Sequence, residues 1–150
     1  MAIIAPTFAD ARDTCIEGES GLRSICANGE ITKWNRSLGE LEFATGAKVK
    51  LFSGDQPDRL RGPQHYAIWV DELAAFQYVQ EAWDMAMFGL RLGADPRCVV
   101  TTTPRPLPLI KRLLSDSTTH VTRGATYENR DNLAPAFFAE IVSRYEGTRL

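Results

Sequence analysis

The sequence predicts an α/β fold in which a mostly parallel sheet is flanked by helices and carries an inserted antiparallel hairpin. Strands and helices alternate through the second half of the 150 residues, which favours a parallel sheet. Residues 66–70 form a continuous apolar run, typical of a strand buried on both faces. Two segments with alternating apolar residues, 40–43 and 48–51, flank Thr45-Gly46, which indicates the hairpin.

The first half of the chain should supply a strand and a helix before this hairpin. The strand is predicted over residues 2–5. Thr7 is expected to cap the helix, because Asp10 stands three residues later and can complete a capping box. The helix should run from about residue 8 to residue 16 and end near Gly18.

The second half should alternate strands with helices after the apolar run. We expect a helix over about 74–92, with apolar residues on one face at helical spacing. Strands over 98–102 and 120–123 and helices over about 107–114 and 135–145 complete the pattern. The residues expected to begin or end these helices are Gly93, Pro135 and Gly147.

Composition and charge exclude several classes of protein. A net charge of −2 gives the whole molecule no general attraction for nucleic acid, so any DNA contact would have to come from a local patch. No apolar run approaches the roughly 20 residues of a membrane span. The separated cysteines, Cys15, Cys26 and Cys98, suit reduced thiols. We therefore expect a cytoplasmic protein without a membrane partner.

The clearest candidate site is the pair Asp71-Glu72, which ends the apolar run. A buried parallel strand delivers its last side chains to the carboxyl edge of the sheet, where open α/β folds bind ligands. In an ATPase with a phosphate-binding loop, one such carboxylate holds Mg²⁺ through water. The next can orient or deprotonate the attacking water, as the second Walker B acid. The alternative is that both acids cap the following helix.

Three threonines, Thr101, Thr102 and Thr103, end the next predicted strand. Their hydroxyls would lie at the same edge of the sheet, where they can hydrogen-bond a phosphate or its attacking water. The alternative is that β-branched residues simply fill a strand that proline stops. Their position one strand–helix unit after the acidic pair favours the ATPase interpretation.

Arg61 is the third candidate and lies in a loop that reaches the base of the apolar strand. A planar guanidinium suits the stabilisation of charge on a transferring phosphoryl group, in its own subunit or in a neighbouring one. The alternative is a solvated loop arginine.

The 150 residues contain no G-x-x-x-x-G-K-[ST] sequence. Because that loop supplies the N–H groups that hold phosphates, we expect residues 1–150 by themselves to be an incomplete P-loop NTPase (ASCE-type) sheet rather than a complete ATPase.

Several motifs together resemble one family, the large terminase subunit of tailed phages and prophages. They are A-P-T-F-A-D-A-R-D at 5–13, L-R-G-P-Q at 60–64, W-V-D-E-L-A at 69–74, T-T-T-P-R-P at 101–106 and N-L-A-P at 132–135. The resemblance covers nearly the whole chain and preserves order and spacing. That family pairs an N-terminal DNA-packaging ATPase with a C-terminal RNase H-like nuclease.

The resemblance implies a role for each candidate. Asp71 would be the Walker B carboxylate that holds Mg²⁺ through water, and Glu72 the catalytic glutamate. The threonines at 101–103 would be the coupling motif that links hydrolysis to movement. Arg61 matches a position suspected in some members of acting in trans on the neighbouring subunit of a ring.

The resemblance also implies cofactors and partners. ATP and Mg²⁺ would serve the complete protein, and neither should bind residues 1–150 tightly. The implied partners are double-stranded DNA, the portal protein, the small terminase subunit and other copies of the chain in a ring, within the cytoplasm of a bacterial host.

Residues 1–150 would then be part of a single ATPase domain. The family's Walker A strand would precede residue 2, and it would lie in the sheet between the strands at 98–102 and 120–123. The nuclease domain would follow residue 150. Two alternatives are a fragment of a helicase-like P-loop motor, which should carry arginine-rich motifs in a second motor domain, and a non-catalytic truncated remnant.

Overall fold

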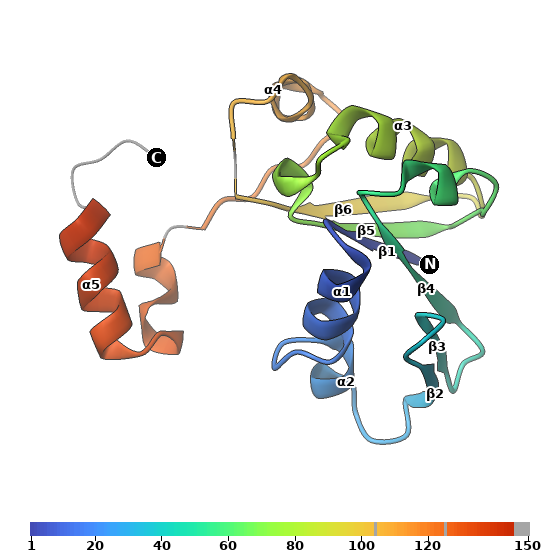
Figure 1. The fold of residues 1–150 in the computed structure, drawn as a ribbon, viewed down its shortest axis with the longest axis horizontal. Helices are drawn as coiled ribbons and strands as arrows, with labels where there is room; N and C mark the ends of the chain where they lie inside the picture. Colours follow the sequence, from blue (N-terminus) through green and yellow to red (C-terminus); the bar gives the residue numbers. More distant parts are fainter. Residues whose placement is uncertain (104, 125, 146–150) are drawn as a thin grey trace. The chain divides into compact units, whose positions relative to one another are not determined.

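Six strands form one sheet within residues 1–113 of the computed structural model, in the order β2-β3-β4-β1-β5-β6 (Figure 1). The structure describes residues 1–103, 105–124 and 126–145. The chain divides into two units, Met1–Leu113 and Leu114–Leu150. All of the strands and both hydrophobic clusters belong to the first unit.

The sheet is mostly parallel, as the sequence predicts, and four of its strands run parallel to one another. They are β1 (Ala2–Ala5), β4 (Lys48–Ser53), β5 (Ala67–Asp71) and β6 (Arg97–Thr101). β1 lies between β4 and β5, and each of its residues is at most 1% exposed. The apolar run therefore forms a strand with a neighbour on either side, β1 and β6.

The antiparallel part of the sheet is larger than predicted. β3 (Glu40–Phe43) pairs antiparallel with β4, which confirms the hairpin. A further strand, β2 (Ile31–Asn35), pairs antiparallel with β3. No residue of β2 is fully buried, so its sequence has no apolar run to mark it.

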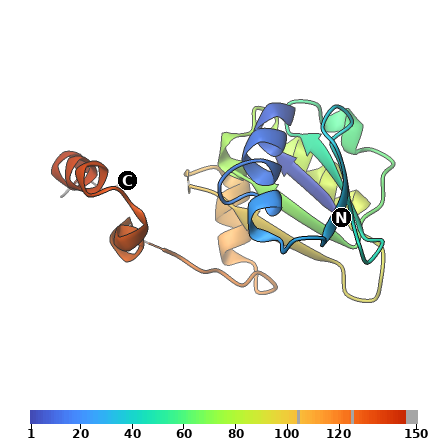
Figure 2. The ribbon, with the colours of Figure 1, turned by 90° about the horizontal axis from the view of Figure 1, so that it is seen from below.

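Helical segments cover both faces of this sheet (Figure 2). On one face lie α1 (Phe8–Asp10), the π-helix η1 (Ala11–Ile16) and α2 (Leu22–Ile25). On the other lie the 3₁₀ turns η2 (Pro57–Leu60) and η3 (Leu73–Ala75), the helix α3 (Val79–Gly89), and Leu109 and Ile110 of α4 (Pro108–Ser115).

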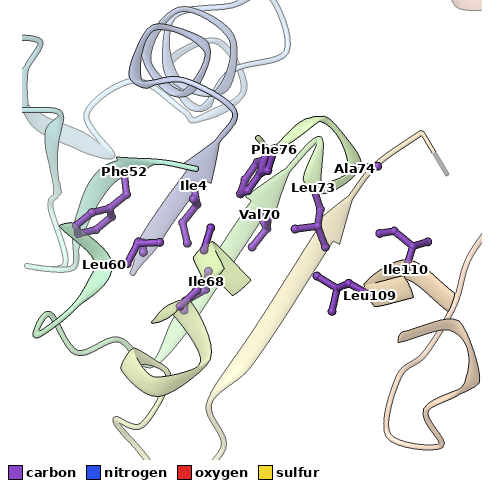
Figure 3. Packing of buried hydrophobic residues seen from close by; sticks show 13 residues of the cluster. Ile4, Phe52, Leu60, Ile68, Val70, Leu73, Ala74, Phe76, Leu109 and Ile110 are labelled. Carbon is purple, nitrogen blue, oxygen red and sulfur yellow. The ribbon is translucent and has the colours of Figure 1, made fainter. Parts of the chain in front are cut away.

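Successive side chains of the central strands point to these two faces in turn. Ile4, Ile68 and Val70 enter the cluster beneath α3 (Figure 3). Ile3 and Trp69 enter the cluster beneath α1 and η1. Because both faces are covered by apolar packing, β1 is apolar throughout and β5 is apolar up to its last residue, Asp71.

The predicted capping box is confirmed. The backbone N–H of Asp10 donates to Oγ1 of Thr7 at 3.1 Å, and the N–H of Thr7 donates to Oδ2 of Asp10 at 3.0 Å. The helical run ends at Ile16, as expected, but its last part, η1, is a π-helix, which the sequence did not predict. A Cβ at Gly18 would lie 2.6 Å from the carbonyl oxygen of Thr14, so only glycine fits there.

The helix predicted over 74–92 is wrong in its length. The chain instead forms the short turn η3, becomes extended at Phe76, and begins α3 only at Val79. The ring of Phe76 packs on Gly54, where a Cβ would lie 2.4 Å from the ring, and this contact requires the turn. α3 ends at Gly89, before the predicted Gly93, because the next residue forms a bridge with His65.

The strand predicted over 120–123 is also wrong. Residues 119–124 belong to no strand or helix, and Val121 is 39% exposed. A strand needs a neighbour to satisfy its backbone groups, and the described sheet ends at β6. The 3₁₀ segment η4 (Thr126–Asn132) was not predicted, whereas α5 (Pro135–Tyr145) begins at the predicted Pro135. The end predicted at Gly147 lies outside the described residues.

In the described part of the chain, no helix combines the length and apolar character needed to cross a membrane.

Candidate functional site

The carboxyl ends of the parallel strands meet at one edge of the sheet. Asp71 is the last residue of β5 and Thr101 is the last residue of β6, and the two are partners in the ladder. The structure therefore brings together two of the predicted candidates, which are far apart in the sequence. This edge is also where open α/β sheets bind their ligands.

A chain of two hydrogen bonds ends on the carboxylate of Asp71. The hydroxyl of Thr101 donates to Oδ1 of Asp71 at 2.6 Å. The same hydroxyl oxygen accepts the indole N–H of Trp69 at 3.1 Å. In the sequence, Trp69 was only one residue of the apolar run 66–70. Its position two residues before Asp71 was the available signal, because residues i and i+2 of a strand share a face.

Glu72 adopts a left-handed backbone conformation, with φ 52° and ψ 46°. It is the one non-glycine residue with positive φ among the residues that the structure describes. Such a conformation costs roughly 1–2 kcal/mol for a residue with a Cβ. It turns the chain directly after β5, and Oε2 of Glu72 accepts the backbone N–H of Thr103 at 3.4 Å.

Thr102 contacts the backbone that follows Asp71 and Glu72. The hydroxyl oxygen of Thr102 accepts the N–H of Ala74 at 3.0 Å and so satisfies an N–H of the turn η3. The three successive threonines, 101, 102 and 103, thus contact Asp71, Ala74 and Glu72 respectively. We expected their hydroxyls to face a phosphate. In the structure, the hydroxyls of Thr101 and Thr102 and the backbone N–H of Thr103 instead bind residues 71–74, here called the acidic segment.

Cys15, on η1, lies beside the same carboxylate. Its side chain is buried, and burial is the largest cause that raises the pKa of its thiol to about 12. A hydrogen bond to Asp71 and the negative charges of Asp71 and Asp10 raise that pKa further. The sequence predicted a reduced thiol but could not place Cys15 against Asp71, because that neighbour comes from β5.

Arg61 lies at the other end of β5. It follows η2, its side chain is 73% exposed, and its guanidinium lies 3.9 Å from Asp58. It lines an open hollow with Phe88 and Gly89, at the end of α3. The structure therefore does not bring Arg61 together with Asp71, and its predicted role stays a prediction.

The carboxylates can be tested against the needs of Mg²⁺. The described residues contain no group of three or more histidine, cysteine, aspartate or glutamate side chains able to hold a metal ion. Mg²⁺ at nucleotide sites is commonly held by one or two carboxylates together with water and substrate phosphates. A single carboxylate at a strand end, as Asp71 is, fits that arrangement.

Comparison with protein families identifies the chain. The family model described as "Terminase large subunit, T4likevirus-type, N-terminal" matches residues 1–150. The chain belongs to this family. No curated protein matches it.

Two solved structures of a large terminase resemble the fold. Both are of the ATPase domain from Thermus phage P74-26, at 16% sequence identity, with 75% of this chain covered. The TM-score is 0.51 for a mutant of that domain and 0.47 for the other structure. The match covers 50% of the solved chain, so the terminase chain described here spans about half the length of the structure it matches. The likeness confirms the predicted α/β fold of helices around a mostly parallel sheet.

Proposed function

We propose that residues 1–150 work in the ATPase domain of a large terminase subunit, the motor that drives DNA into a phage procapsid by hydrolysing ATP. The observation that carries the proposal is the contact between Thr101 and Asp71 at the carboxyl edge of the sheet, in a chain that matches this family along its whole length. An acid fixed at that edge is what metal-assisted phosphoryl transfer requires.

Within the site, each acid has a separate task. Asp71 is held by the Thr101 hydroxyl, so its carboxylate can receive a metal-bound water without first reorganising. Glu72 lies beyond the strand end and is the group that orients or deprotonates the attacking water. Bound Mg²⁺ would neutralise charge on the phosphates of ATP. The sequence offers no glycine-rich loop for those phosphates, so we expect residues 1–150 alone to bind ATP weakly.

The threonines supply the coupling between hydrolysis and movement. Hydrogen bonds join the three threonines to Asp71, Glu72 and Ala74. A displacement of the end of β6 should therefore move residues 71–74, and a displacement of residues 71–74 should move the end of β6. This mechanical connection supports the coupling role that the family resemblance implies for residues 101–103.

Arg61 acts between subunits in this proposal. Its position at the opposite end of β5 from Asp71 favours action on the nucleotide of another copy over action on its own. The partners are then other copies in a ring, double-stranded DNA, the portal protein and the small terminase subunit, in the cytoplasm of a bacterial host.

The proposal is tested by the ATPase activity of the large subunit that carries these residues. Hydrolysis should require Mg²⁺ and increase with double-stranded DNA, and Asp71→Asn should reduce it by about 100-fold or more. Asp95→Asn is the matched control, because the exposed Asp95 pairs with Arg97, the first residue of β6, at the opposite end of that strand from Thr101. Equal activity of the two variants would refute the assignment.

A further inference from the structure

We infer that Trp69 is a positioning residue for the acidic site: its indole N–H fixes the hydroxyl of Thr101, and that hydroxyl fixes the carboxylate of Asp71. The hydrogen-bond chain stands by itself. Its consequence for metal binding rests on the function proposed above.

The argument begins with the hydroxyl of Thr101, which has one proton to donate and can accept two hydrogen bonds. Two acceptors compete for that proton, Oδ1 of Asp71 at 2.6 Å and the carbonyl oxygen of Val70 at 3.4 Å. The indole N–H of Trp69 approaches the same oxygen at 3.1 Å and occupies one of its acceptor positions. The bond to the ionised oxygen is the shorter and stronger of the two, so the proton is directed to Asp71.

The indole is partly buried, and its place in the fold limits its motion. Trp69 and Asp71 lie on the same face of β5, and Thr101 is the ladder partner of Asp71. The ring packs against the cluster that contains Ile3 and Cys15, beneath η1. A partly buried tryptophan that packs on this cluster can therefore orient a hydroxyl at a lower entropic cost than a flexible polar side chain.

This arrangement also assigns the two oxygens of Asp71. Oδ1 accepts the Thr101 hydroxyl, so Oδ2 is the oxygen that would remain to accept a metal-bound water. Cys15, on η1, lies beside the same carboxylate. Without the indole N–H, the Thr101 hydroxyl can turn toward Val70, and Asp71 loses its fixed orientation.

The hydrogen-bond chain can be measured directly on the 150-residue chain by NMR. We expect the indole N–H signal of Trp69 to be protected from hydrogen exchange. Thr101→Val, which removes the acceptor at nearly constant volume, should shift the signal and speed its exchange by about tenfold or more. Thr101→Ser should preserve both, and Thr103→Val is the nearby control. An unchanged Trp69 signal in Thr101→Val would overturn the proposal.

The consequence is measured on the ATP-hydrolysing large subunit. Trp69→Phe keeps the aromatic bulk but lacks the N–H, and we expect it to raise the Mg²⁺ concentration for half-maximal turnover about tenfold. Trp34→Phe is the matched control, since the indole of Trp34 donates to Glu17 at 2.9 Å, away from the site. Equal Mg²⁺ dependence of the two variants would overturn the positioning role. If instead the unsubstituted subunit showed no Mg²⁺-dependent turnover, the proposed function would be wrong. The hydrogen-exchange experiment would still show whether Trp69 donates to Thr101.

Discussion

The hydroxyl of Thr101 donates a 2.6 Å hydrogen bond to a carboxylate oxygen of Asp71, although the two residues are 30 positions apart in the sequence. Hydrogen bonds to charged groups contribute roughly 1.5–3 kcal/mol when they are protected from water. This bond therefore joins the ends of β5 and β6 into one unit and gives the acidic site a defined geometry before any ligand arrives.

Removing this bond should weaken the fold as well as the site. We expect Thr101→Val to lower the free energy of unfolding by about 1 kcal/mol, below the range for bonds protected from water, because Thr101 is exposed and Asp71 is only half-buried. Urea unfolding followed by circular dichroism measures the change. Thr103→Val, which keeps the backbone N–H that Thr103 donates, should change stability less. A larger loss in Thr103→Val would contradict the account.

The left-handed backbone of Glu72 should be detectable in the stability of Glu72 variants. Its left-handed backbone favours glycine, so Glu72→Gly should be about 1 kcal/mol more stable than Glu72→Ala, since both variants lose the carboxylate and differ in the backbone cost. Denaturant melts of the two variants give the difference directly. A more stable alanine variant would contradict the hypothesis that the backbone at Glu72 is strained.

His65 should make stability depend on pH. Its side chain is 7% exposed, its Nε2 is buried without a partner in the described structure, and burial lowers the pKa of the imidazole. Below the ordinary histidine pKa of about 6.5, the unfolded chain binds a proton that the folded chain resists, so stability falls as pH falls from about 7 toward the lowered folded pKa. His65→Gln should flatten this dependence, and His120→Gln, at an exposed position, should not. Parallel curves for all three proteins would exclude the effect.

Arg61 should be required by a neighbouring subunit. Arg61→Ala should lower the activity of the assembled motor by a factor of order 10³ if it fully serves as an arginine finger. Mixing Arg61→Ala subunits with Glu72→Gln subunits should restore some turnover, because some interfaces then combine an intact arginine with an intact glutamate. Co-assembled mixtures without any recovery would assign Arg61 to its own subunit or to the loop structure.

The sequence predicts the elements whose physical cause is local. The capping box of Thr7 and Asp10, the hairpin around Thr45-Gly46 and the buried strand that ends in Asp71 each depend on neighbours within a few residues, and each is present. The helix over 74–92 failed for the opposite reason. Phe76 packs on Gly54, which is distant in the sequence, and this contact keeps Phe76 extended. The extended residue interrupts the predicted helix.

The candidate site likewise has features that the sequence predicts and features that depend on distant contacts. Placing Asp71 and Thr101 at one edge required only the strand–helix alternation. The contacts that define the site, from Trp69 through Thr101 and from Cys15, depend on the register of β5 with β6 and on the packing of η1. No single-residue pattern reports register, so neither Trp69 nor Cys15 could be linked to Asp71 from the sequence.

The most direct measurement of the central claim separates nucleotide binding from hydrolysis in the large subunit that carries these residues. Glu72→Gln removes the charge that would activate water and leaves Asp71 unchanged, so Mg²⁺–ATP affinity should stay within about twofold while single-turnover hydrolysis falls by about 100-fold or more. Glu81→Gln, on the exposed side of α3, is the control and should retain full hydrolysis. Hydrolysis by Glu72→Gln within a few-fold of the control would contradict the assignment of this edge as the hydrolytic site.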